Sequence, residues 1–110
     1  MFKIPPEHIP AVLDAYVTLR ATAVHPSTKQ PYIVSNESRR VSNTDSPISA
    51  GYTIISQSVF ANWEDANFYD KECPAHKELK KVTGKYRTGD VLTLIYESEV
   101  GVVPVGEAKL

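Results

Sequence analysis

The sequence predicts an α+β fold of the ferredoxin-like type, with the element order strand, helix, strand, strand, helix, strand (βαββαβ). Three observations lead to this prediction. A stub of a strand precedes a first amphipathic helix, two strand-like segments occupy the middle of the chain, and a proline-interrupted helix and a final strand close it. Four strands and two helices in this order form one sheet with both helices on one face. A chain of 110 residues is long enough for one such core, so we assign residues 1–110 to a single domain.

Residues 7–24 show the periodicity of an amphipathic helix. Residues 1–4 leave room only for a strand stub before Pro5 and Pro6. Pro10 is compatible with a helix only in its first turn, and His25 ends the helix because a residue before proline avoids the helical region. Apolar side chains recur at three- and four-residue spacing, at Ile9, Val12, Leu13, Tyr16, Leu19 and Ala23.

Residues 32–35 are a short strand candidate, and residues 36–50 are polar and rich in turn-forming residues. We therefore expect an irregular segment over residues 36–50. A mobile surface loop is the usual form of such a segment, and a lid over a functional site is the alternative.

Residues 51–79 contain the strongest local signals. Residues 52–61 are rich in β-branched and aromatic side chains, which favours a strand. Asn62 and Asp65 have the spacing of a helix-capping pair. Pro74 lacks a backbone N–H, so we expect the helix after residue 62 to break at Cys73–Pro74 and restart with His76 near its beginning.

The last part of the chain predicts one more strand. Turn-forming residues at 83–85 and 88–90 close the second helix and lead into residues 91–98, VLTLIYES, which we predict to be the final strand. The tail at residues 101–110 is apolar enough to pack across a partner subunit.

The central strand carries apolar side chains on both faces. Two helices can cover only one face of a four-stranded sheet, so the other face needs a partner, and a second copy is the simplest one. We therefore expect a homodimer whose two sheets face each other. The two faces consist of Tyr52, Ile54, Ser56, Ser58 and Phe60 on one side and Thr53, Ile55, Gln57, Val59 and Ala61 on the other.

Composition excludes several classes of function. The formal net charge is −1, from 12 basic and 13 acidic residues, so no bulk positive field attracts nucleic acid or an anionic membrane. A single cysteine excludes an internal disulfide, and no cysteine or histidine pair has the spacing of a metal site. No apolar run reaches the ~20 residues of a membrane span. We expect a soluble cytoplasmic protein without a cofactor or metal ion.

Residues in the central stretch also resemble a known family. The glycine–tyrosine strand start at Gly51, the Phe-x-x-x-Glu-Asp helix entry at Phe60, Phe68-Tyr69 and Pro74-Ala75-His76 are similar to the stress-responsive dimeric α/β-barrel (Dabb) domain family. The likeness extends from residue 2 to about residue 98. It implies a ferredoxin-like subunit that pairs into a dimeric α/β barrel around an apolar pocket for a small aromatic or polyketide-like ligand.

His76 and Tyr69 are the candidate catalytic residues. A histidine can accept or donate a proton near neutral pH. In plant polyketide cyclases of the family, the matching histidine is the catalytic base and a tyrosine shortly before it orients the substrate, which the resemblance transfers to His76 and Tyr69. The alternative for His76 is a helix-start histidine that makes only a backbone hydrogen bond. For Tyr69 the alternative is an ordinary core aromatic residue.

The resemblance further implies a ligand pocket lined by Tyr16, Tyr52, Ile54 and Trp63. Tyr16 lies on the apolar stripe of the first helix and is equally well explained as a core residue, and Trp63 as a core or interface anchor. Two departures from the cyclases stand out. Ile54 occupies the position of a pocket histidine, and the longer first strand of the family, with its own histidine, is absent before Phe2.

Three classes of function agree with these observations. The first is a cofactor-free cyclase or lyase that acts on an aromatic or polyketide-like substrate with His76 as general base. The second is a binding protein that uses the same pocket without turnover. The third is a structural stress-response protein in which the dimer itself is the functional unit.

Overall fold

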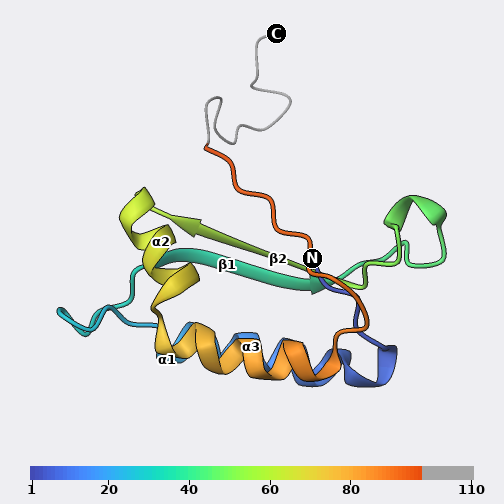
Figure 1. The fold of residues 1–110 in the computed structure, drawn as a ribbon, viewed down its shortest axis with the longest axis horizontal. Coiled ribbons are helices and arrows are strands. Elements are labelled where there is room, and N and C mark those ends of the chain that lie inside the picture. The colour runs from blue at the N-terminus through green and yellow to red at the C-terminus, as the bar shows by residue number, and fades with distance from the viewer. Residues whose placement is uncertain (98–110) are drawn as a thin grey trace, which may run out of the picture.

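The computed structural model describes residues 1–97, and within this range it shows an α+β fold with three α-helices and a two-stranded antiparallel sheet (Figure 1). Helices α1 and α3 pack against each other and form a layer below the sheet, and α2 lies at the end of β2 (Figure 1). In chain order the elements are α1 (Ile9–Thr22), β1 (Ile33–Arg40), β2 (Ile54–Phe60), α2 (Trp63–Lys71) and α3 (Pro74–Tyr86), with short 3-10 turns at Pro6–His8 and Pro47–Ser49.

The two strands pair over almost their whole length, from Ile33 opposite Phe60 to Arg40 opposite Ile54. The expectation of an irregular segment over residues 36–50 is therefore wrong for its first five residues, which continue β1 to Arg40. Polar composition did not prevent a strand here, because β2 supplies the backbone partners and its side chains pair with the polar side chains of β1. The remainder of that segment contains the 3-10 turn Pro47–Ser49.

The predicted final strand is not formed in the described residues 91–97, and residue 98 lies outside them. Met1 exchanges two backbone hydrogen bonds with Leu92, at 2.7 and 3.1 Å, and Phe2 forms an isolated antiparallel bridge with Ile54. Within the described residues 91–97, the backbone pairs with the N-terminal segment only at Leu92. Among the described residues, the sheet therefore lacks two of the four strands of the ferredoxin-like prediction.

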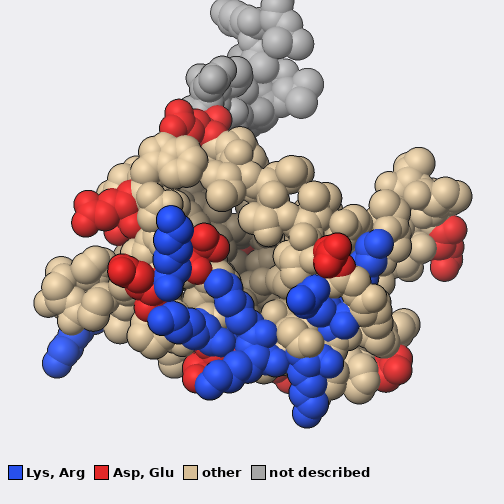
Figure 2. Space-filling view, viewed as in Figure 1, with Lys and Arg blue, Asp and Glu red and all other residues tan. Residues whose placement is uncertain are grey.

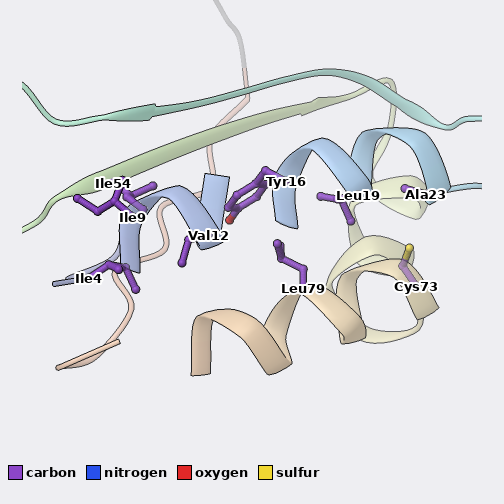
Figure 3. Close-up of a cluster of buried hydrophobic side chains, with 9 residues drawn as sticks. All are labelled: Ile4, Ile9, Val12, Tyr16, Leu19, Ala23, Ile54, Cys73 and Leu79. Atoms are coloured by element: carbon purple, nitrogen blue, oxygen red, sulfur yellow. The ribbon is translucent and has the colours of Figure 1, made fainter. Parts of the chain in front are cut away.

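The hydrophobic core lies between the helix layer and the start of β2 (Figure 3). The predicted stripe of the first helix is confirmed, because its apolar side chains point into this core at three- and four-residue spacing. The helix is shorter at both ends than the predicted range of residues 7–24, because α1 begins at Ile9 and ends at Thr22. The buried residues of this core are Ile4, Ile9, Val12, Tyr16, Leu19, Ala23, Ile54, Cys73 and Leu79.

The predicted capping and break of the second helix are confirmed. The Asn62 side chain accepts a hydrogen bond from the backbone N–H of Asp65 at 2.8 Å, which caps α2. Pro74 lies in the first turn of α3. The N–H groups of a first turn make no hydrogen bond within the helix, so proline costs none here. The break at Cys73 turns the chain so that His76, in the first turn of α3, packs against Tyr69 of α2.

The outward face of α3 is basic. Figure 2 shows lysine and arginine side chains gathered over this helix, whose exposed positions include Lys77, Lys80, Lys81 and Lys85. None of the described helices is long and apolar enough to cross a membrane. The apolar tail at residues 101–110, predicted to pack across a partner, lies outside the described residues.

Candidate functional site

Four polar side chains form a row on the face of the sheet that points toward the helices. Asn36 and Ser38 of β1 lie opposite Ser58 and Ser56 of β2, and all four are half-buried. The face of a sheet that packs on helices is normally apolar. We call these four residues the inner polar row.

The inner polar row is tied together by hydrogen bonds that use the full capacity of the Asn36 amide. Its nitrogen donates to Ser58 at 2.9 Å and to Ser56 at 3.2 Å, and its oxygen accepts from Ser38 at 3.0 Å and from Arg20 Nε of α1 at 3.1 Å. An asparagine amide offers two donors and two acceptor lone pairs, so no capacity is left over. The orientation of this side chain is therefore fixed from all sides.

Tyr69 and His76 meet next to this row. Their rings stack with centroids 3.8 Å apart and an interplanar angle of 12°. His76 Nδ1 lies 2.7 Å from the backbone carbonyl oxygen of Tyr69. Because a carbonyl oxygen can only accept, Nδ1 carries the proton, and the neutral ring presents the lone pair of Nε2.

The protonation state of His76 favours a role as a base. Burial lowers the pKa of His76 below its usual 6.5 and the charge of Lys80 adds to this, whereas the hydrogen bond to Tyr69 and the charge of Asp70 oppose it. The ring is therefore neutral at pH 7. A neutral imidazole with a free Nε2 is the form that accepts a proton from a substrate.

Tyr16 and Tyr69 bring two phenol groups to the inner polar row. Burial raises the pKa of Tyr16, and the Ser56 side chain opposes this rise. Burial likewise raises the pKa of Tyr69, the Tyr16 phenol adds to the effect, and the Ser58 side chain opposes it. Both phenols are thus neutral O–H groups at physiological pH, and each lies beside a serine of the row.

Aromatic rings continue from this cluster into the space between β2 and α2. The Phe60 ring lies 5.2 Å from the Tyr69 ring and 6.2 Å from Tyr32, which contacts Phe68 at 5.1 Å. These rings form an apolar wall beside the polar row. A site with one aromatic wall and a few fixed polar groups is typical of small-molecule binding.

The surface is hollowed between the strands and α3 (Figure 2). The inner face of the sheet borders this hollow. A depression of about 220 Å³ lies at the edge of β1 and adjoins the inner polar row, because Asn36 and its partner Arg20 both line it. Its volume is below the roughly 300 Å³ at which ligand pockets begin. The remaining lining residues are Ala23, Pro31, Ile33, Val34 and Ser35.

The structure brings together three of the six residues singled out from the sequence, His76, Tyr69 and Tyr16. His76 and Tyr69 are in direct contact. Tyr16 lies close enough to Tyr69 to affect its ionisation, and it is also a core residue, as the alternative prediction held.

The other three predicted residues lie elsewhere. Ile54 is completely enclosed in the core. Tyr52 precedes β2, and the ammonium group of Lys3 lies over its ring at 5.0 Å. Trp63 is 51% exposed at the start of α2 and donates a hydrogen bond to the Glu97 carboxylate. Their role as ligand contacts stays a prediction.

Sequence reasoning missed the inner polar row. The alternation of β2 did place Ser56 and Ser58 on the same face as Ile54, and that signal was available. Asn36 and Ser38 were hidden because their segment was expected to be irregular. Within residues 1–97, no group of three or more histidine, cysteine, aspartate or glutamate side chains is placed to hold a metal ion.

Comparison with known proteins gives one relative. The chain is 36% identical over 69 residues to the fusaristatin A biosynthesis cluster protein of Gibberella zeae. The match covers 63% of this chain and 49% of that protein, so the chain spans about half the length of its relative. No protein-family model matches the chain, and no solved structure matches it.

Proposed function

We propose that this chain is a homodimeric member of the stress-responsive dimeric α/β-barrel family and acts as a cofactor-free cyclase or lyase. Its substrate is a small aromatic or polyketide-like molecule held between the sheet and the helices. His76 is the general base, Tyr69 orients the substrate, and Tyr16 lines the site. The observation that carries the proposal is the neutral, Nδ1-protonated His76 stacked on Tyr69.

The chemistry needs a base beside an oxygen-binding donor. Nε2 of His76 takes a proton from a carbon between two carbonyl groups, and the electron pair left on that carbon forms a bond to another carbonyl carbon of the same molecule. The alkoxide oxygen created in this step takes the proton back from the imidazolium. The Tyr69 phenol, neutral because burial raises its pKa, is suited to donate a hydrogen bond to a carbonyl oxygen during the step.

Two backbone contacts support the ferredoxin-like strand order. Phe2 bridges Ile54 in an antiparallel sense, and Met1 pairs with Leu92, so the N-terminal segment lies between β2 and the last described residues. With β1 on the other side of β2, these contacts support the strand order that we propose for a ferredoxin-like sheet. In the proposed dimer, residues 91–97 complete that sheet.

The outer face of the sheet supports the proposed homodimer. Ile55 and Val59 point away from the helices and are 46% and 43% exposed, and Leu94, Ile95 and Tyr96 are exposed to about 70%. Exposed apolar side chains of this number are suited to an interaction site. A second copy that presents the same face would cover it.

The relative supports a role in small-molecule biosynthesis. By its name, the fusaristatin A biosynthesis cluster protein belongs to a cluster that makes a small molecule. We propose that this chain also acts in small-molecule biosynthesis, without proposing that its product is fusaristatin A.

The experiment compares wild type with His76→Ala in a screen of aromatic and poly-β-carbonyl compounds, with products identified by mass spectrometry. Loss of general-base catalysis should lower the rate by ~10²–10⁴-fold, with binding retained. His8→Ala is the matched control, because His8 also stacks on a tyrosine, Tyr86, at 4.3 Å. Equal product formation by wild type and His76→Ala would remove the base from the mechanism. Binding without any product would make the chain a ligand-binding protein.

A further inference from the structure

The donor and the acceptor of each hydrogen bond in the inner polar row can be assigned. Both amide protons of Asn36 go to Ser56 and Ser58, so each of these hydroxyls accepts. Ser38 gives its proton to the Asn36 oxygen at 3.0 Å. The 2.8 Å contact between Ser38 and Ser56 therefore has Ser56 as its donor.

Ser58 differs from the other two serines of the row. Its oxygen accepts from Asn36, and none of the hydrogen bonds among the described residues uses its own proton. The hydroxyl lies beside the Tyr69 phenol and lowers the pKa of that group against the larger rise from burial.

Arg20 stands at the other end of the chain of donors. Its guanidinium donates to the Asn36 oxygen, and Asn36 donates to Ser58. A permanent positive charge at the start of such a chain polarises each O–H and N–H in the same direction. The O–H of Ser58 is the last member of the chain, and the nearby Tyr69 ring packs against Phe60 and His76.

We infer that the inner polar row is a binding site for a carbonyl oxygen of an apolar ligand, with Ser58 and the Tyr69 hydroxyl as the donors that contact it. Asn36 and Arg20 are positioning residues that hold and polarise these donors. The groups that contact the ligand are neutral donors, so the row selects ketones and related oxygen acceptors over hydrocarbons of the same shape. The site named here lies within the proposed function and rests on its ligand pocket.

A polar row on an inward face contributes little to the stability of the fold. Replacing hydrogen-bonded partners on an inward face by apolar groups is often neutral or stabilising. Functional sites commonly keep polar side chains at positions where apolar ones would give a more stable fold. A single substitution such as Ser58→Ala leaves one Asn36 amide proton without its acceptor, so it should lower thermal stability as well as ligand selectivity.

The test uses two probes that differ in a single carbonyl group, 1-tetralone and tetralin, titrated into the full chain and followed by NMR. Wild type should bind 1-tetralone about 3- to 10-fold more tightly than tetralin, the ratio expected for a net hydrogen bond. Ser58→Ala and Tyr69→Phe should each lower this ratio toward 1, and Asn36→Leu should lower it through loss of positioning. Ser58→Thr keeps the hydroxyl and should retain the ratio, and Ser42→Ala, in the exposed loop after β1, is the matched control.

The outcomes separate this inference from the proposed catalysis. A ketone preference that depends on Ser58 and survives in His76→Ala supports the inference even when no turnover is found. Turnover that depends on His76, without a ketone preference, would overturn the inference and leave the proposed base in place. Equal binding of both probes, or binding of neither, would overturn it as well. A lower melting temperature of Ser58→Ala with an unchanged ratio would mean that the row is structural only.

Discussion

The two faces of the β1–β2 sheet depart from the usual distribution of side chains. The inner face, which points toward the helices, carries the hydrogen-bonded row Asn36, Ser38, Ser56 and Ser58. The outer face, which points away from them, exposes Ile55 and Val59 together with the polar residues Glu37, Arg39 and Gln57. A sheet that packs on helices in a solitary subunit normally shows the opposite pattern.

This distribution assigns three different roles to three regions of the sheet: folding, ligand binding and association with a second copy. The end of the inner face at Ile54 is apolar and belongs to the core, so folding depends on this end. The middle of the inner face is polar and lies beside His76 and Tyr69, which suits a ligand site. The outer face exposes the apolar side chains Ile55 and Val59 beside the charged pair Glu37 and Arg39, which suits a second copy of the chain. Each role can be tested by a substitution that affects one region and leaves the others unchanged.

The largest expected effect comes from two neighbouring isoleucines on opposite faces. Ile54→Ala removes a completely enclosed side chain and should lower the free energy of unfolding by about 2–5 kcal/mol. Ile55→Ala changes a side chain that is 46% exposed and should cost well under half as much. Urea unfolding of both variants, at a concentration where their oligomeric states are equal, provides the comparison. Similar losses would show that the two faces are not distinct in the folded protein.

A charge on the outer face should act on assembly instead of on folding. Val59→Asp places a carboxylate in the proposed interface, where its desolvation opposes association, and should weaken the dimer by at least about 10-fold. Sedimentation equilibrium measures the change. Ser42→Asp, outside both faces, should leave the dimer intact. A wild-type protein that is monomeric at micromolar concentration would contradict the proposed interface directly.

The lowered pKa of His76 predicts a pH dependence with a definite sign. In the unfolded chain the ring takes up a proton near pH 6.5, but in the folded protein it does so only at lower pH. The unfolded state therefore binds more protons in this window, so His76 makes stability fall as the pH drops below about 6.5. Thermal unfolding of wild type and His76→Gln between pH 7.5 and 5 tests this. The variant should lose less stability over this range than wild type, and parallel curves would contradict the lowered pKa.

The same shift sets the expected pH profile of any turnover. A general base is active in its neutral form, so the rate should rise with pH through the lowered pKa and level off before pH 7. A profile that rises above pH 7 would point to a different base.

The smallest expected effect concerns a hydroxyl outside the row. The Tyr32 oxygen is buried and has no hydrogen-bond partner among residues 1–97, in contrast to the satisfied oxygens of the inner polar row. Burial without a partner is unfavourable, so Tyr32→Phe should raise the free energy of unfolding by up to about 1 kcal/mol. Calorimetry measures this, with Tyr86→Phe at the end of α3 as a control. A clear loss of stability in Tyr32→Phe would show that the hydroxyl has a partner in solution.

The sequence predicted the helices and the central strand well because their signals are local. The stripe of α1, the Asn62 cap and the break at Pro74 each follow from a few neighbouring residues. The extension of β1 and the state of residues 91–97 depend on what lies beside them in space, which local patterns do not contain. The backbone of β2 was available to pair with the polar end of β1. Beyond Leu92, in contrast, the backbone of the last segment has no strand partner among the described residues.

The candidate site divides in the same way. His76 and Tyr69 were proposed from the sequence because they lie in the stretch, Phe68-Tyr69 and Pro74-Ala75-His76, that resembles a known family. The inner polar row was not predicted, because its residues come from two strands and only the register of Asn36 with Ser58 and Ser38 with Ser56 brings them together.

Two side-chain amides give the most direct test of the contrast between the faces. Asn36 lies on the inner face within the polar row, and Gln57 lies on the outer face, where its amide donates to the Tyr96 hydroxyl. Each NH₂ group has its own signals in a ¹⁵N NMR spectrum, which can be followed as 1-tetralone is added to the protein. We predict that the Asn36 amide signals shift with the binding curve of the ketone and that the Gln57 signals stay in place. A shift of Gln57 without a shift of Asn36 would place the ligand on the outer face and contradict the account.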